Sequence, residues 1–325
     1  MLRLDNKKGQ GIQFNWIYVV LAGAIILGFF SWFIVRYIDL QNTSLDAKVA
    51  RNIDSNLLAI KGASQFKPVI DLGDSFAFDF SCDSLTVNTR HTQKIDDKII
   101  FSSEHITKTR NLNVWTYGLD AGFFVDNLIY IIDPKQKYYL VYDKDKDFVQ
   151  TLYDRMPNSL YNNIFISDYA GASLSSAGKN KFVLFFEPSG EQLEILSSKG
   201  KVVSIEAKQS GKITFYDFGS VSVDSFFGYG LLYGAVFSDS LEQYGCSKKR
   251  VLDKLGLLSN IYYTKARNLA KISNDPLCDY NTVSNLLKSF SESARNSDIG
   301  VMSKSIEPLV YENRRLYDLS CEGVF

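Results

Sequence analysis

The feature that most constrains this chain is an uncharged run near its N-terminus, from Trp16 to Val35. Its sequence, WIYVVLAGAIILGFFSWFIV, is long enough to span the hydrocarbon layer of a bilayer as one helix. Aromatic residues lie toward both ends of the run, where amphipathic rings suit the headgroup zone. A buried helix of a soluble core is the alternative, but such helices rarely hold so many apolar residues in a row. We therefore predict one transmembrane helix over residues 16–35.

Basic residues flank this run on both sides, and they decide its expected orientation. Arg3, Lys7 and Lys8 precede it, and Arg36 follows directly. The wider counts of Lys and Arg are nearly equal, but close to the run the N-terminal side is more basic. We expect a single-pass protein of the cell membrane. Residues 1–15 would form a cytoplasmic basic tail, and the long C-terminal part would be extracytoplasmic.

The sequence Lys7-Lys8-Gly9-Gln10 resembles the processing site of archaeal class III signal peptides, the type IV pilin kind. The resemblance implies cleavage between Gly9 and Gln10, which leaves the apolar helix on the mature protein. The chain departs from that pattern at Gly11, and at Phe14, where many pilins carry Glu. It is also similar to a group of archaeal, N-terminally anchored membrane proteins of unknown activity. That similarity lies in GQGIQFNWIYVVLAGAIIL, NVWTYGLDAGFFVDNLIYIIDPKQKYYLVY and GAVFSDSLEQYGCSKKRVLDKLGLLSNIY.

Composition limits the classes of function and the compartment. Lys+Arg and Asp+Glu are both 36, so no basic excess points to nucleic acid, and an apolar share of 46% allows a proper core. All four cysteines follow the apolar run, an arrangement that favours two disulfides outside a reducing compartment. Four buried thiols are the alternative. With two His and no CxxC, the spacing fits no zinc site.

Residues 36–65 are expected to continue as a helical stem. Apolar residues recur there every three or four positions, namely Leu45, Val49, Ile53, Leu57 and Ile60. This stripe must be buried, either by the chain's own domain or by self-association with a neighbouring copy through the anchor and stem helices. Asn42 begins an N-glycosylation sequon. The lipid bilayer is the other expected partner, and no cofactor is expected.

Residues 66–225 have mainly β patterns, so the fold class is α+β. Alternation at Phe76, Phe78 and Phe80 predicts a half-buried strand, and further strands are expected at intervals to Phe218. One helix is expected at 148–156 and a loop at 170–180. The segments 192–196, 202–207 and 213–218, separated by turns, predict an antiparallel meander.

Residues 226–325 are expected to be helical and packed on the sheet. FFGYGLLYGAVF, residues 226–237, is too short to cross a membrane and predicts a buried helix. Helices over 247–273, 281–295 and 301–319, joined by short links, predict an antiparallel bundle. In an up-down-up arrangement Cys278 and Cys321 lie at one end and Cys246 at the other. The expected disulfides are therefore Cys278–Cys321 and Cys82–Cys246.

No motif predicts catalytic, cofactor-binding or metal-binding residues. Asp143, Asp145 and Asp147 lack the Gly and Glu of a calcium loop, so a turn and helix cap are favoured. Ser176 and Lys179 have an acyl-enzyme spacing without its companion motifs. His91 and His105 are expected to be surface or hydrogen-bonded residues. Lys248, Lys249 and Arg250 form a short basic cluster, which is more often solvated than a binding site.

These observations favour a membrane-anchored, extracytoplasmic structural or interaction protein of the cell surface, without catalysis. A pilin-like subunit, processed after Gly9 and assembled in a filament, is the first alternative. A surface enzyme with a site formed only in three dimensions is the second.

Overall fold

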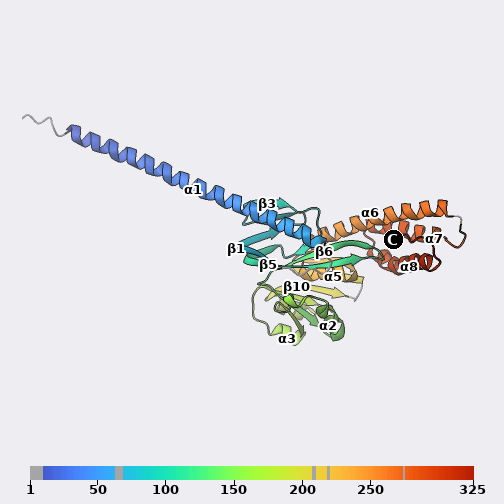
Figure 1. Cartoon of the computed structure of the whole chain (residues 1–325). Helices are drawn as coiled ribbons and strands as arrows, with labels where there is room; N and C mark the ends of the chain where they lie inside the picture. The colour runs from blue at the N-terminus through green and yellow to red at the C-terminus, as the bar shows by residue number, and fades with distance from the viewer. Residues whose placement is uncertain (1–9, 63–68, 207–209, 218–219, 274) are drawn as a thin grey trace, which may run out of the picture.

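The computed structural model describes residues 10–62, 69–206, 210–217, 220–273 and 275–325. Its elements form stacked layers, and a single long helix projects from them (Figure 1). The order of the layers is this helix, a first sheet, a short buried helix, a second sheet and a pair of covering helices. The three C-terminal helices extend away from the layers as an arm (Figure 1).

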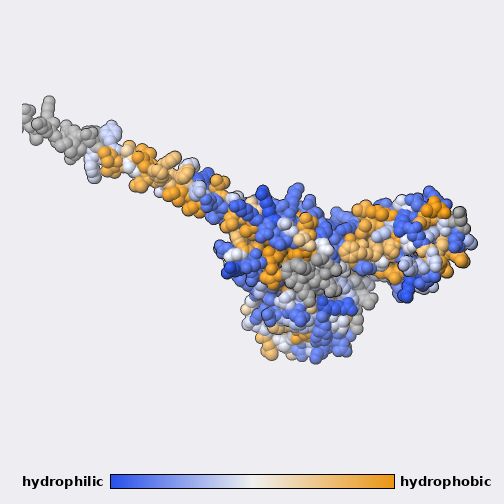
Figure 2. Space-filling model, in the orientation of Figure 1, coloured by the Kyte–Doolittle hydropathy of each residue, from blue (hydrophilic) through white to orange (hydrophobic). Residues whose placement is uncertain are grey.

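The projecting helix, α1 (Gln10–Lys61), is continuous from the apolar run into the domain. It is exposed from Trp16 to Leu45 except for three partly buried positions, and its apolar half is visible in Figure 2 as an orange rod. It is the one helix in the described part of the chain that is long and apolar enough to cross a membrane. From Asp46 onward one face is buried against the first sheet, through the stripe Val49, Ala50, Ile53, Leu57 and Ile60. The predicted stem therefore packs on its own domain.

The first sheet has the strand order β3-β2-β1-β5-β6-β4. Its strands are β1 (Val69–Phe80), β2 (Ser84–Val87), β3 (His91–Lys94), β4 (Ile100–Ser102), β5 (His105–Asp120) and β6 (Phe124–Ile132). All neighbours are antiparallel except β4 and β6. The expected alternation holds in β1, because Phe76, Phe78 and Phe80 point to the α1 side and are buried.

The second sheet has the order β12-β11-β10-β9-β7-β8 and is mixed. Its strands are β7 (Lys137–Tyr142), β8 (Ile164–Asp168), β9 (Asn180–Leu184), β10 (Gly200–Glu206), β11 (Ser210–Asp217) and β12 (Ser220–Phe227). The four strands from β8 to β10 are parallel, and they are joined by α2 (Lys146–Asp154), α3 (Tyr169–Ser173) and α4 (Gly190–Ser197). A short 3-10 helix, η1 (Asn158–Leu160), follows α2. Helices α3 and α4 cover one face, and α2 lies on the other.

Two expectations about this region are wrong. Residues 192–196 form most of α4 instead of a strand, because Ser189 and Gln192 make a reciprocal capping box that starts a helix there. The antiparallel meander is consequently limited to β10, β11 and β12. The expected loop at 170–180 contains the short helix α3, whose N-cap Asp168 accepts a hydrogen bond from the Gly171 amide.

The short buried helix is α5 (Gly228–Phe237), which lies between the two sheets as the apolar segment predicts. Two glycines one turn apart let it approach the first sheet closely. A Cβ on Gly234 would lie 2.6 Å from Phe101 Cε1, and one on Gly230 would lie 2.8 Å from Leu128 Cδ1. The Tyr130 hydroxyl donates to the Gly230 carbonyl at 2.8 Å. Both sheets therefore pack against the same short helix, α5.

The C-terminal arm consists of α6 (Leu241–Ile272), α7 (Asn281–Arg295) and α8 (Ile299–Asp318). α6 begins six residues before the expected position, where the Ser240 hydroxyl accepts from the Gln243 amide. Pro308 lies inside α8. The disulfides Cys82–Cys246 and Cys278–Cys321 are those expected, with Cα atoms 5.8 and 5.7 Å apart. The second closes a 43-residue separation and contributes about 4 kcal/mol on the chain-entropy account.

Candidate functional site

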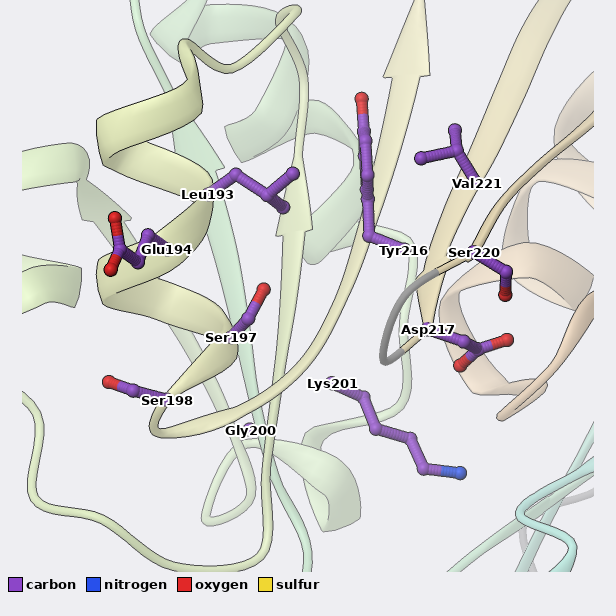
Figure 3. Close-up of a pocket in the computed structure, with 10 residues that line it drawn as sticks. All are labelled: Leu193, Glu194, Ser197, Ser198, Gly200, Lys201, Tyr216, Asp217, Ser220 and Val221. Atoms are coloured by element: carbon purple, nitrogen blue, oxygen red, sulfur yellow. The ribbon is translucent and has the colours of Figure 1, made fainter.

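The first candidate site is a groove of about 630 Å³ beside α4, at the uncovered end of the second sheet. α4 covers β10, but no helix of the described chain covers the same face of β11 and β12. The close-up in Figure 3 shows α4 at one side of the groove and the edge strand β12 at the other. Side chains of Leu193, Tyr216 and Val221 lie between these two sides. The groove therefore has an apolar centre.

Charged residues line the rim of this groove and not its centre. Glu194 points away from the groove on the far side of α4, and Lys201 and Asp217 lie at the lower end of the view and point away from Leu193 and Val221 (Figure 3). Lys201 Nζ lies 3.3 Å from the Asp239 carboxylate, which is 5% exposed. The groove thus offers apolar contact and the Ser197 hydroxyl, without a charge directed into it.

Asp239 belongs to a second candidate, a polar junction where both sheets meet the link between α5 and α6. Its Oδ2 accepts from the Glu104 amide at 3.2 Å, and the Glu104 carboxylate in turn accepts from the Ser240 hydroxyl. Asp239 Oδ1 and Ser238 Oγ are buried without a hydrogen-bond partner in the described part of the chain. The junction ties the start of β5 and the start of β10 to the N-terminus of α6.

Lys181 is the most unusual member of the junction, because it is a fully buried lysine at the second position of β9. Its ammonium donates to the carbonyls of Ala235, at 2.9 Å, and Ser238. It also lies 5.7 Å from the ring centroid of Phe215. Burial lowers the pKa of Lys181 to about 7, and the nearby Asp239 carboxylate opposes part of that effect. These carbonyls accept the ammonium at the C-terminal end of α5, which is favourable for a cation.

The remaining charges at the junction are paired. Asp133, which is fully buried, forms an ion pair with Lys179, and Lys179 also donates to the His105 carbonyl at 2.9 Å. The His105 ring forms a hydrogen-bonded pair with Asp79 on β1. Charged groups in this arrangement hold elements together.

A second pocket, of about 770 Å³, adjoins the junction. The disulfide Cys82–Cys246 and the pair Asp79–His105 line it, together with the first turn of α6. Within the described residues there is no group of three or more His, Cys, Asp or Glu that could hold a metal ion. The Glu104 carboxylate, bonded to Ser240, already occupies the N-terminus of α6.

The structure separates the residues that the sequence singled out. Gly9 lies outside the described residues, and Gln10 is the first residue of α1. Asn42 is half-buried on α1 and lines a different pocket, of about 460 Å³, near the turn between β2 and β3. His91 and His105 lie on β3 and β5, which are separated by two strands. The expected processing and glycosylation remain predictions.

Two of the motifs that were weighed have structural roles. Lys248, in the basic cluster, forms an ion pair with Asp224 on β12, and Arg250 donates to the Lys98 carbonyl at 3.0 Å. Asp145 occupies the predicted N-cap position of α2, but its side chain makes no cap hydrogen bond. The residues that sequence reasoning missed are Lys181, Asp239 and Glu104. A lysine inside the apolar run NKFVLFF was the one available signal.

Comparison of the chain with protein-family models, with curated proteins and with solved structures gave no match.

Proposed function

We propose that the chain is a membrane-anchored, extracytoplasmic interaction protein that holds a layered domain on a rigid helix. The observation that carries this proposal is the division of α1 at Asp46. Before that residue the helix exposes apolar side chains that a bilayer would cover, such as Leu21, Ile25 and Phe29. After it, the helix is part of the domain core.

Contacts at this division make the connection between anchor and domain stiff. The buried Asp46 carboxylate accepts from Asn88 Nδ2 at 2.8 Å and lies 2.8 Å from Arg90 Nε. About two turns further along α1, Lys98 Nζ lies 2.7 Å from the Asp54 carboxylate. The Asn127 amide group donates to the Lys61 carbonyl at 2.7 Å, at the end of the helix. These contacts support a rigid connection between α1 and the domain instead of a flexible linker.

Two disulfides support an oxidising, extracytoplasmic location for the domain. The test of location uses intact cells or right-side-out vesicles and a protease added outside. We expect the domain to be digested while the N-terminal tail is protected, and we expect the full chain to resist extraction by alkaline carbonate. Protection of the domain from external protease would reverse the proposed orientation. Extraction of the full chain by carbonate would contradict the proposal that α1 anchors it in the membrane.

The pilin-like alternative is favoured by one observation of its own. The part of α1 from residue 16 to 45 is exposed over about eight turns, and this leaves it available to pack against helices of other copies. In a filament, the helices of neighbouring copies would cover that surface instead of lipid. Mass analysis of the mature chain tests this alternative, because class III processing gives Gln10 as the first residue. An intact Met1 or Leu2 would remove its main support.

A further inference from the structure

The outer edge of β12 ends the second sheet among the described strands. Residues Ser220–Asp224 pair with β11 on one side only. Beyond them the edge is closed, because Tyr244 and Lys248 of α6 both donate to the Ser225 carbonyl. The stretch 220–224 therefore presents backbone groups that can pair with another strand.

The side chains of this edge continue the groove beside α4. Val221 and Val223 are 62% and 53% exposed, and they lie on the same sheet face as Tyr216 and Thr214, their β11 partners. Tyr216 leans over the sheet, with its hydroxyl 3.4 Å from Ser204 Oγ. An added strand along β12 would place alternate side chains beside Val221 and Val223, at the open side of the groove.

Protective devices common on edge strands are missing here. The segment Ser-Val-Ser-Val-Asp has no proline and no lysine, and the register with β11 shows no bulge. Its carboxylate, Asp224, is paired with Lys248 and is not directed outward along the edge. By contrast, β3, one of the two outer strands of the first sheet, carries His91 and Lys94 and packs against α1.

We propose that the β12 edge and the groove beside α4 bind an extended segment of a partner protein as an added strand. The occupant has uncharged, preferably β-branched side chains at the positions that face the groove, because no charged side chain points into it. Its backbone supplies the hydrogen bonds, and the groove supplies the preference for apolar side chains.

A second copy of this chain fits the edge less well. Antiparallel pairing of β12 with β12 requires a two-fold axis normal to the second sheet. α1 runs along the layers and not through them (Figure 1), so this axis would send the two anchors in different directions. One membrane could not hold both. The exclusion of a second copy rests on the proposed anchoring. The exposed edge and its groove are independent of it.

The test uses the full chain in lipid nanodiscs as bait for a phage-displayed library of random dodecapeptides. We expect enriched peptides to alternate apolar and polar residues. A synthetic copy of an enriched peptide should bind at least tenfold more weakly to the double variant Val221→Lys/Val223→Lys. The matched control is Val69→Lys, a strand valine of the first sheet that is 51% exposed, and it should bind like wild type.

Hydrogen exchange identifies the mode of binding. With peptide bound, amides within 220–224 should become protected, while those of β3 should not change. Enrichment no greater than on empty nanodiscs would overturn the proposal, as would equal binding by the two lysine variants or unprotected β12 amides. Dimerisation that the double lysine variant abolishes would assign the edge to a second copy and also overturn it. Retention of the chain in membranes is measured separately, so failure of the anchor is distinguishable.

Discussion

At the scale of single residues, Lys181 links the chemistry of the core to pH. Its pKa is about 7 in the folded chain and near 10.5 when unfolded, so between these values the unfolded state binds more protons. Stability should therefore rise with pH from about 7 toward 10. Above 10 the trend should reverse, because burial raises the pKa of Tyr130 and Tyr244 in the folded state. Urea unfolding at pH 7, 8.5 and 9.5 measures the rise.

The variant Lys181→Met should lose this rise, because methionine fills a similar volume without a titrating group. Lys212→Met is the matched control. Lys212 is exposed on β11, where Glu206 raises its pKa, and its loss should leave the rise between pH 7 and 9.5 intact. The same pH dependence in Lys181→Met and wild type would contradict the assignment.

At the scale of elements, close packing of α5 on the first sheet gives opposite predictions for two glycines. Gly234→Ala should destabilise the fold by about 1–3 kcal/mol, since its Cβ would overlap the buried Phe101 ring. Gly256→Ala on α6 should stabilise it by up to about 1 kcal/mol, because the new Cβ finds ordinary contacts at 3.6 Å and alanine favours the helix. Thermal unfolding of both variants distinguishes the two, and equal effects would show that α5 can shift.

The elements also show how much of the fold the sequence could predict. Uncharged apolar runs predicted the first part of α1 and most of α5, helical spacing predicted the rest of α1 and α7, and helix topology gave both disulfides. Leu193 and Ile195 alternate like a strand, and the capping box that makes α4 was overlooked although Ser189 and Gln192 have its spacing. The parallel order of β8 to β10 depends on contacts between distant segments. The junction at Asp239 depends on the same long-range contacts, so neither follows from local pattern.

At the scale of the whole molecule, α1 has an exposed apolar part and a part buried in the domain, and two truncations should separate their roles. Removing residues 1–36 should leave a soluble, folded domain, because the buried face of α1 begins only at Asp46. Removing residues 1–61 should give an unfolded or aggregated product, since Phe78, Leu85 and Ile106 lose their cover. Circular dichroism and size-exclusion chromatography measure both outcomes. A folded product from the longer deletion, or membrane retention of the shorter one, would contradict this division.

Because α1 passes without interruption from the apolar run into the domain, the angle of the domain above a membrane is not independent of the bilayer. A helix of 52 residues is about 78 Å long, so a change of about 10° in its tilt moves its far end by roughly 13 Å. Thinner bilayers increase the tilt of a long apolar helix. The thickness of the lipid layer would thus set how far the β12 edge stands from the surface, and with it which neighbouring proteins come within reach.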